Sequence, residues 1–302
     1  MNLAILLSYR LFHCTYKKPA LKRLFVSLTS NLSIAVILGI LVLICAITTG
    51  CVSDLDLRMF TTDFSYGLSI YTDEPITNAT FYIPLPVKNG MPMVGDRPLV
   101  ESDFNQGNIV ASFTQSPPGL DLTGAYPVPN NTPWFVKLTA AEISPGLKTD
   151  SRTNPAYDVS ITDHKTLTSP ILFLNTLMPV GNESVFLPKL EFNPSLPTKK
   201  QSRSPDWLEY DDLLNSEKTM VYANYTSTPS VEIHGGSNLR GYNSWKESYD
   251  ASISNFYSDG YQWSWTGEAP GWQIVTGSLY SAGIYPNLTH PEWQRAIQRS
   301  QQ

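Results

Sequence analysis

A run of residues without any charge extends from Leu24 to Val52, close to the start of the chain. Its second part, 32–52, would form a helix of roughly 31 Å, which matches a hydrocarbon core of about 30 Å. A buried helix of a globular domain is the alternative, but this length and apolarity favour a membrane segment. The sequence therefore predicts a short basic head (1–31), a transmembrane or lipoprotein-signal segment (32–52) and a long body.

The charges on either side of this segment predict its orientation. The head carries five lysine and arginine residues and no acid, and the first acid after the segment is Asp54. The positive-inside rule then places the head in the cytoplasm and the body outside the membrane. The whole chain has a net charge of −5, so the part beyond the head is strongly acidic. Such a body argues against a nucleic-acid partner, because phosphate contacts need clustered lysine and arginine.

The end of the segment leaves two kinds of anchor open. Residues 48–51, Thr-Thr-Gly-Cys, resemble a prokaryotic lipobox, in which cleavage exposes a cysteine that carries lipid. The small Gly50 fits this pattern, whereas Thr48 stands where an aliphatic residue is preferred. The segment is therefore either an uncleaved signal-anchor or a signal that ends at a lipidated Cys51. Both versions tether the body to the outside of a cell membrane.

The body must fold without disulfides, because the cysteines are Cys14, Cys45 and Cys51. It is rich in Tyr, Trp, Ser, Thr, Asn and Pro, which favour strands and turns. Alternating large apolar residues predict strands at 64–70 and 81–87. Because Pro84 and Pro86 lack an N–H, the second of these is expected to be an edge strand or an extended arm.

The pattern as a whole predicts a mainly β chain with an antiparallel β-sandwich-like extracytoplasmic body. We divide it into a first β region (53–192), a linker or long loop (193–206) and a second, aromatic-rich β region (207–302). Short helices are expected at 206–214, where Asp206 could cap the first turn, and at the C-terminus, 289–297.

The sequence shows no recognisable catalytic set. His234-Gly-Gly-Ser237 is similar to an oxyanion-hole turn, but the nucleophile elbow that should accompany it is missing, so we interpret it as a Gly-rich hairpin turn. The four histidines do not have the spacing of metal ligands, so neither a metal site nor a cofactor is expected. Clustered carboxylates leave one alternative, an envelope enzyme that acts on glycans through acids such as Glu209 or Glu268.

Aromatic residues concentrate between 242 and 285, among glycine, serine and asparagine. Rings beside amide and hydroxyl groups suit the binding of sugars or peptides, although the same rings could fill a cysteine-free core. The candidate ligand-binding aromatics are Tyr242, Trp245, Tyr261, Trp263, Trp265 and Trp272. Asn-x-Ser/Thr sequons give candidate glycosylation sites at Asn78, Asn130, Asn182, Asn224 and Asn287.

One stretch of the chain runs from Asn78 to Gly90 and follows the Thr-Gly-Cys end of the apolar segment. It resembles a sequence motif of uncharacterised membrane-tethered surface proteins of methanogenic archaea. The resemblance implies an archaeal envelope setting and transfers no functional residue. We therefore expect a membrane-anchored protein with a non-catalytic binding or structural role at the cell surface. Its expected partners are the membrane and cell-surface glycans or proteins.

Overall fold

The computed structural model describes residues 60–125, 131–149, 152–167, 185–191, 199–200, 207–248 and 251–287, and scattered residues beyond 287. The chain separates into two compact units, Met1–Leu55 and Asp56–Gln302, and every described residue belongs to the second. The predicted head, the membrane segment and Cys51 lie outside the described residues. Within the described ranges, no helix is both long enough and apolar enough to span a membrane.

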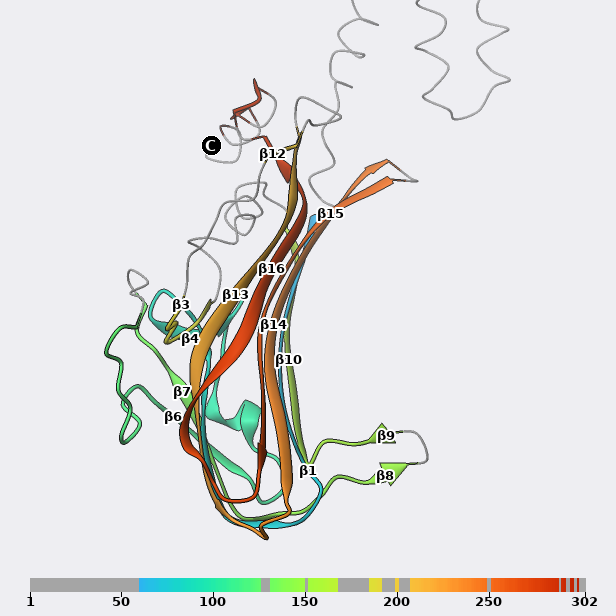
Figure 1. Ribbon diagram of the computed structural model, residues 1–302. Coiled ribbons are helices and arrows are strands. Elements are labelled where there is room, and N and C mark those ends of the chain that lie inside the picture. Colours follow the sequence, from blue (N-terminus) through green and yellow to red (C-terminus); the bar gives the residue numbers. More distant parts are fainter. Residues whose placement is uncertain are drawn as a thin grey trace, which may run out of the picture. The chain divides into compact units, whose positions relative to one another are not determined.

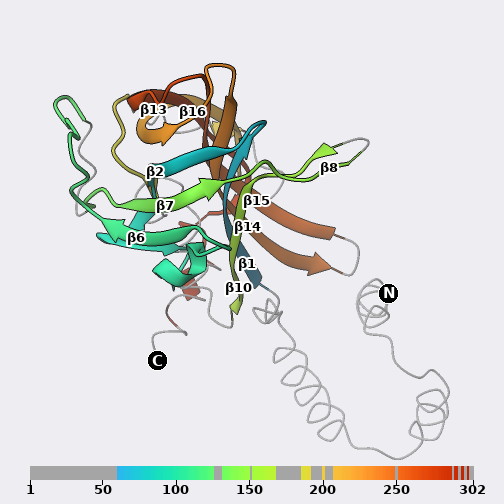
Figure 2. The ribbon, with the colours of Figure 1, turned by 90° about the horizontal axis from the view of Figure 1, so that it is seen from below.

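The described chain is mainly β and is built around one antiparallel sheet of ten strands. The strands lie in the order β10-β1-β14-β15-β16-β13-β2-β7-β6, and β12 pairs with β13. Its long strands run side by side and curl together (Figure 1), and β2, β7 and β6 continue the sheet across them (Figure 2). The strands are β1 (Phe60–Thr72), β2 (Ile76–Pro84), β6 (Val110–Thr114), β7 (Phe135–Ile143), β10 (Tyr157–Leu167), β12 (Lys199–Lys200), β13 (Trp207–Thr226), β14 (Glu232–Ser248), β15 (Ala251–Thr266) and β16 (Gly271–Pro286).

Smaller elements complete the described part of the chain. A four-stranded sheet has the order β11-β3-β4-β5, and β8 and β9 form a separate hairpin. The 3-10 helix η2 (Glu101–Phe104) precedes the edge strand β6. The short strands are β3 (Pro86–Lys88), β4 (Met91–Val94), β5 (Arg97–Pro98), β8 (Lys148–Thr149), β9 (Arg152–Thr153) and β11 (Val185–Phe186).

Alternation along the strands separates an inner apolar face from an outer polar face. The predicted set Phe64, Tyr66, Leu68 and Ile70 is buried in one hydrophobic core, as the alternation in β1 requires. Strands from both sides of 193–206 meet in the same sheet, since β1 pairs with β14 and β2 pairs with β13. Both β regions therefore contribute to one core.

The prediction of an edge strand at 81–87 is wrong. β2 pairs with β13 on one side and with β7 on the other, so it is an internal strand. Pro84 is its last residue, the Leu85 N–H donates to the Trp134 carbonyl at 2.8 Å, and Pro86 begins β3 in the smaller sheet. The two prolines thus lie where the chain passes from one sheet to the other, and their missing N–H groups interrupt neither ladder.

Two further expectations are corrected. The helix expected at 206–214 is instead the start of β13, which pairs with β16 from Trp207 onward. Pairing with a neighbouring strand outweighs the local capping signal there. His234-Gly-Gly-Ser237 is no turn but lies inside β14, paired on both sides. The expected C-terminal helix falls on a segment of which only single residues are described.

Candidate functional site

The outer face of the sheet carries a row of small polar positions. Because successive side chains alternate between faces, the strand register defines which outer residues are neighbours. One row crosses six strands, from β10 to β13, and consists of Ser160, Gly67, Asn238, Gly260, Ser278 and Ser216. Next to it runs a second row, formed by Asp158, Ser69, Gly236 and Gln262. The centre of the outer face is therefore almost free of bulky side chains.

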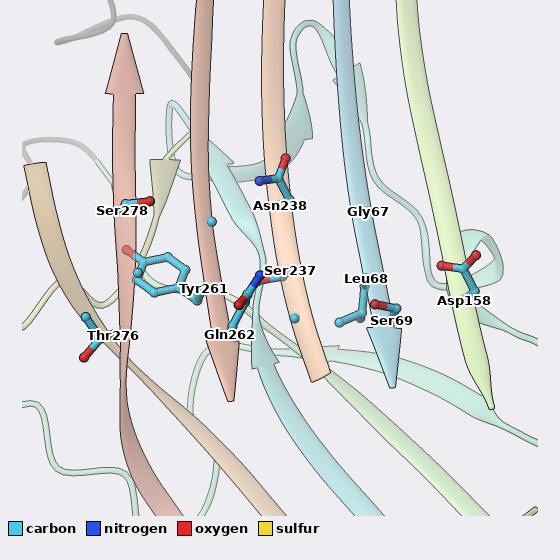
Figure 3. A pocket seen from close by; sticks show the side chains of 13 residues that line it. Gly67, Leu68, Ser69, Asp158, Ser237, Asn238, Tyr261, Gln262, Thr276 and Ser278 are labelled. Atoms are coloured by element: carbon cyan, nitrogen blue, oxygen red, sulfur yellow. The ribbon is translucent and has the colours of Figure 1, made fainter. Parts of the chain in front are cut away.

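These rows border a groove of about 500 Å³, the outer groove, which is lined by residues 67–69, 158, 236–238, 260–262 and 276–278. Asn238, Gln262, Ser278 and Asp158 come from four different strands (Figure 3). Glycines form part of its floor: a Cβ at Gly67 would meet no atom closer than the Val159 carbonyl oxygen at 3.9 Å. The hollow thus exists because side chains are missing there, and amide and hydroxyl groups surround it.

A second hollow of about 530 Å³ continues the outer groove toward the other end of the strands. It shares Ser69, Gly236 and Gln262 with the first and reaches Tyr71 and Trp263. The shared residues make one continuous path across β1, β14 and β15. At its far end the half-buried ring of Tyr71 lies beside polar groups, and this combination can orient polar ligands.

A series of contacts similar to a catalytic triad lies at the far end of the second hollow. It is formed by Glu232, His234 and Ser264. Ser264 Oγ is 2.9 Å from His234 Nδ1, and His234 Nε2 is 3.7 Å from Glu232 Oε2. The second distance exceeds a hydrogen bond, and the side chains of His234 and Glu232 are 54% and 60% exposed. A nucleophile also needs donors for a developing oxyanion in a site that excludes water. The geometry suits hydrogen bonding to a ligand better than acyl transfer.

The structure places the predicted ligand-binding aromatics in several environments. Tyr261 and Trp263 are 1% and 6% exposed and belong to the core. Trp265 is partly buried and stacks on Trp263 with ring centroids 6.1 Å apart, whereas Tyr242 is exposed. The side chain of Trp245 lies outside the described set.

Trp272 belongs to a separate aromatic group with Tyr82, Tyr222 and Phe135. Its ring centroid lies 6.2, 5.3 and 5.7 Å from theirs, respectively. The indole N–H donates to the Pro118 carbonyl oxygen at 3.0 Å. This ring therefore holds the 116–120 loop against the sheet, and no single platform unites the six aromatic residues.

Glu209 and Glu268, the carboxylates named for an envelope enzyme, are far apart. Glu209 pairs with Ile284 near the start of β13. Glu268 lies in the β15–β16 turn, three residues before Gly271, which pairs with Ala223 near the other end of β13. The intervening length of β13 corresponds to about 45 Å along the strand, against the 5–10 Å that a glycosidase pair needs. Across the described ranges, no group of three or more His, Cys, Asp or Glu side chains could hold a metal ion.

Two of the sequon asparagines lie on neighbouring strands. Asn78 in β2 and Asn224 in β13 are both exposed, and Asn224 pairs with Thr80, the threonine of the Asn78 sequon. Asn287 is half-buried, and its side-chain oxygen accepts from the Thr289 hydroxyl at 2.7 Å. Asn130 and Asn182 lie outside the described residues.

No protein-family model, no curated protein and no solved structure matches this chain. The resemblance to archaeal surface proteins therefore stays a prediction. The outer groove was not expected from the sequence, although glycine, serine and amide residues stand at alternating positions of 67–69, 236–238 and 260–262. The pairing of these segments becomes visible only in the folded sheet.

Proposed function

We propose that this chain is a membrane-tethered protein of the cell surface whose extracytoplasmic body binds glycans in the outer groove. The observation that carries the proposal is the row of glycine, hydroxyl and amide groups that crosses six paired strands. Sugar hydroxyls are both donors and acceptors, and the side chains of Asn238, Gln262 and Ser278 offer both kinds of group. Tyr71, which is half-buried at the adjoining hollow, adds apolar surface that a sugar ring can cover.

The placement of this body rests on the N-terminal sequence. An uncharged segment of bilayer length follows a basic head, and an acidic, cysteine-free body follows the segment. The anchor is a signal-anchor helix or a lipid on Cys51. We further infer that the body is sandwich-like, with its curled sheet folded around one core, and that a short helix ends the chain.

A binding role agrees better with the groove than catalysis does. Asp158 supplies the carboxylate among the residues that line the outer groove, and hydrolysis of glycosides by the usual route needs two carboxylates at a set separation. The groove is also open to solvent, whereas excluding water from a site strengthens the electrostatic interactions that catalysis uses.

An array of oligosaccharides, probed with the full-length protein in detergent, tests the ligand class. We expect retention on a subset of hexose and N-acetylhexosamine oligomers. Absence of binding to every oligosaccharide, with the protein shown to be folded by circular dichroism, would overturn the glycan assignment.

Topology is tested separately with protease added to intact cells. Digestion of the body without lysis is the expected result, and full protection of the body until lysis would contradict an external location. Mass spectrometry of the mature N-terminus then decides between a signal-anchor and a lipidated Cys51.

A further inference from the structure

A group of polar side chains meets inside the core, on the face of the sheet opposite the outer groove; besides the four described next, the Tyr257 hydroxyl lies 3.5 Å from Asp259 Oδ2. The side chains of Lys189, Glu217 and Asp259 are all 0% exposed. Lys189 Nζ contacts Glu217 Oε2 directly and lies 3.0 Å from Asp259 Oδ2. The Tyr261 hydroxyl donates to Glu217 Oε2 at 2.9 Å. We refer to these four residues as the charge cluster.

The fold holds Lys189 in this position from both sides. Leu190 N–H donates to the Lys218 carbonyl oxygen at 2.9 Å, and the Thr219 hydroxyl donates to the Pro188 carbonyl oxygen at 2.6 Å. Both bonds tie the backbone next to Lys189 to β13. These backbone hydrogen bonds fix the position of the Lys189 amine above the sheet. The conformational entropy lost in ordering it is therefore offset by the fold and not by the contacts within the charge cluster.

The strand register brings the two carboxyl groups to the same point. Glu217 on β13 and Asp259 on β15 both face inward, and β16 runs between them. On β16, Gly277 pairs with Glu217 on one side and with Tyr261 on the other. A Cβ at Gly277 would lie 2.4 Å from the Tyr261 ring, so glycine allows this ring to cross β16 and reach Glu217.

The carboxyl oxygens of the charge cluster have fewer partners than those of an ordinary buried ion pair. It contains two carboxyl groups for one ammonium, and within the described part of the chain Glu217 Oε1 and Asp259 Oδ1 are buried without a hydrogen-bond partner. Unsatisfied buried charges are costly, and attraction to one ammonium offsets this cost only partly. Burial, and then the neighbouring Asp259, raises the pKa of Glu217 to about 7, although Lys189 opposes the shift. Glu217 can therefore both hold and release a proton near neutral pH.

We propose that Lys189 and Asp259 become joined by an amide bond between Nζ and Cγ, and that Glu217 moves the protons that this reaction requires. The reactants are already in contact, isolated from water, and bordered by a carboxyl group that touches the amine. The cross-link is thus a self-modification of the folded chain, and it is independent of what the outer groove binds.

The reaction needs no other reactant. The Lys189 ammonium passes one proton through Glu217 to Asp259, which leaves a neutral amine and a neutral carboxylic acid. The nitrogen lone pair then forms the bond to Cγ while the C=O electron pair moves to oxygen. Glu217 takes a second proton from nitrogen and delivers it to the Asp259 hydroxyl, which leaves as water while the C=O bond reforms.

The balance is one ammonium and one carboxylate converted to one amide and one water, with Glu217 regenerated. The product removes two buried charges from the core. The bond also joins two positions 70 residues apart in a body that has no cysteine. It would therefore restrain the unfolded chain as a disulfide does in other extracellular proteins.

Mass spectrometry of the full-length protein, denatured and digested with trypsin, tests the proposal. We expect a branched peptide, lighter by one water than its two components, whose fragment ions connect Lys189 to Asp259. The K189R variant should lack it, and so should E217Q, which keeps the size of Glu217 and one acceptor oxygen but cannot carry the proton. As a matched control we choose K218R, because Lys218 forms an exposed ion pair with Glu191 at 2.6 Å and should be irrelevant to the cross-link.

Wild-type protein that is folded by circular dichroism, is cleaved normally after Lys189 and yields no branched peptide would overturn the proposal and leave an ordinary ion pair. A bond to Glu217 instead of Asp259 would contradict the assignment of the electrophile, and a bond that persists in E217Q would contradict the proton transfer. The wild-type result decides the main point even if a variant fails to fold.

Discussion

At the scale of single residues, protonation of the buried Glu217 makes the free energy of unfolding depend on pH. In the unfolded chain this carboxyl ionises near its ordinary pKa of 4.5, whereas burial in the folded protein raises that pKa to about 7. Between these values the folded state binds more protons than the unfolded state. The free energy of unfolding therefore falls as the pH rises through this window and levels off above it.

The E217Q variant should lose this fall. The pKa of about 7 belongs to the protein in which Lys189 and Asp259 are not joined, so the comparison uses wild type without this bond and E217Q. The difference between their unfolding free energies should change by roughly 3 kcal/mol from pH 4.5 to pH 8, because glutamine does not titrate. Urea unfolding at several pH values measures it. E191Q, which alters an exposed carboxylate, should follow the wild-type curve, and parallel curves for wild type and E217Q would refute the assignment.

Two glycines on opposite faces of the sheet should respond differently to alanine. A Cβ at Gly277 would lie 2.3 Å from the Gly260 carbonyl oxygen and 2.4 Å from the Tyr261 ring, so G277A must displace the ring that donates to Glu217. We expect a loss of about 1–3 kcal/mol of stability, as for other overpacked core sites.

G67A is the matched control, because a Cβ at Gly67 would make only an ordinary contact with the Val159 carbonyl oxygen at 3.9 Å, and no positive φ opposes it. Its stability should stay within about 0.5 kcal/mol of wild type. Thermal or urea unfolding of both variants makes the comparison, and equal losses would contradict the packing described around β16.

At the scale of elements, the sequence predicted which residues of a strand are buried better than it predicted where strands begin and which strands pair. The alternation of Phe64, Tyr66, Leu68 and Ile70 was sufficient to identify β1 and its buried face. The start of β13 looked helical because Asp206 and the acids after it are local signals, whereas pairing with β16 is a long-range interaction. Likewise, Pro84 and Pro86 suggested an edge strand or an extended arm, whereas they lie where the chain passes from β2 to β3 in the smaller sheet.

The internal position of β2 can be tested by hydrogen exchange. Consecutive residues of an internal antiparallel strand donate alternately to its two neighbours, so every amide from Thr80 to Tyr82 should be protected. An edge strand would leave every second amide open to exchange. Rapid exchange at alternate residues of β2, under conditions where β14 is protected, would contradict the sheet order.

At the scale of the whole molecule, the described chain presents two faces with different chemistry. The inner face holds the core and the charge cluster, and the outer face holds the outer groove. Neither could be derived from the sequence, because their residues come from strands whose pairing joins positions such as Gly67 and Asn238, or Glu217 and Tyr261, that are distant along the chain. The small residues at alternating positions of these strands are visible in the sequence but do not by themselves indicate a groove, since glycine and serine are equally typical of loops.

The claim that the outer groove binds glycans is tested most directly by titrating the full-length protein with an oligosaccharide retained on the array. In the G67Y variant a tyrosine side chain would project into the groove from a position where its Cβ makes only an ordinary contact at 3.9 Å, so the fold should be retained. S112Y, an exposed position on β6 outside the groove, is the matched control. Isothermal titration should show at least a tenfold weaker affinity for G67Y, about 1.4 kcal/mol or more, and wild-type affinity for S112Y. Unchanged binding by a folded G67Y protein would contradict the central claim.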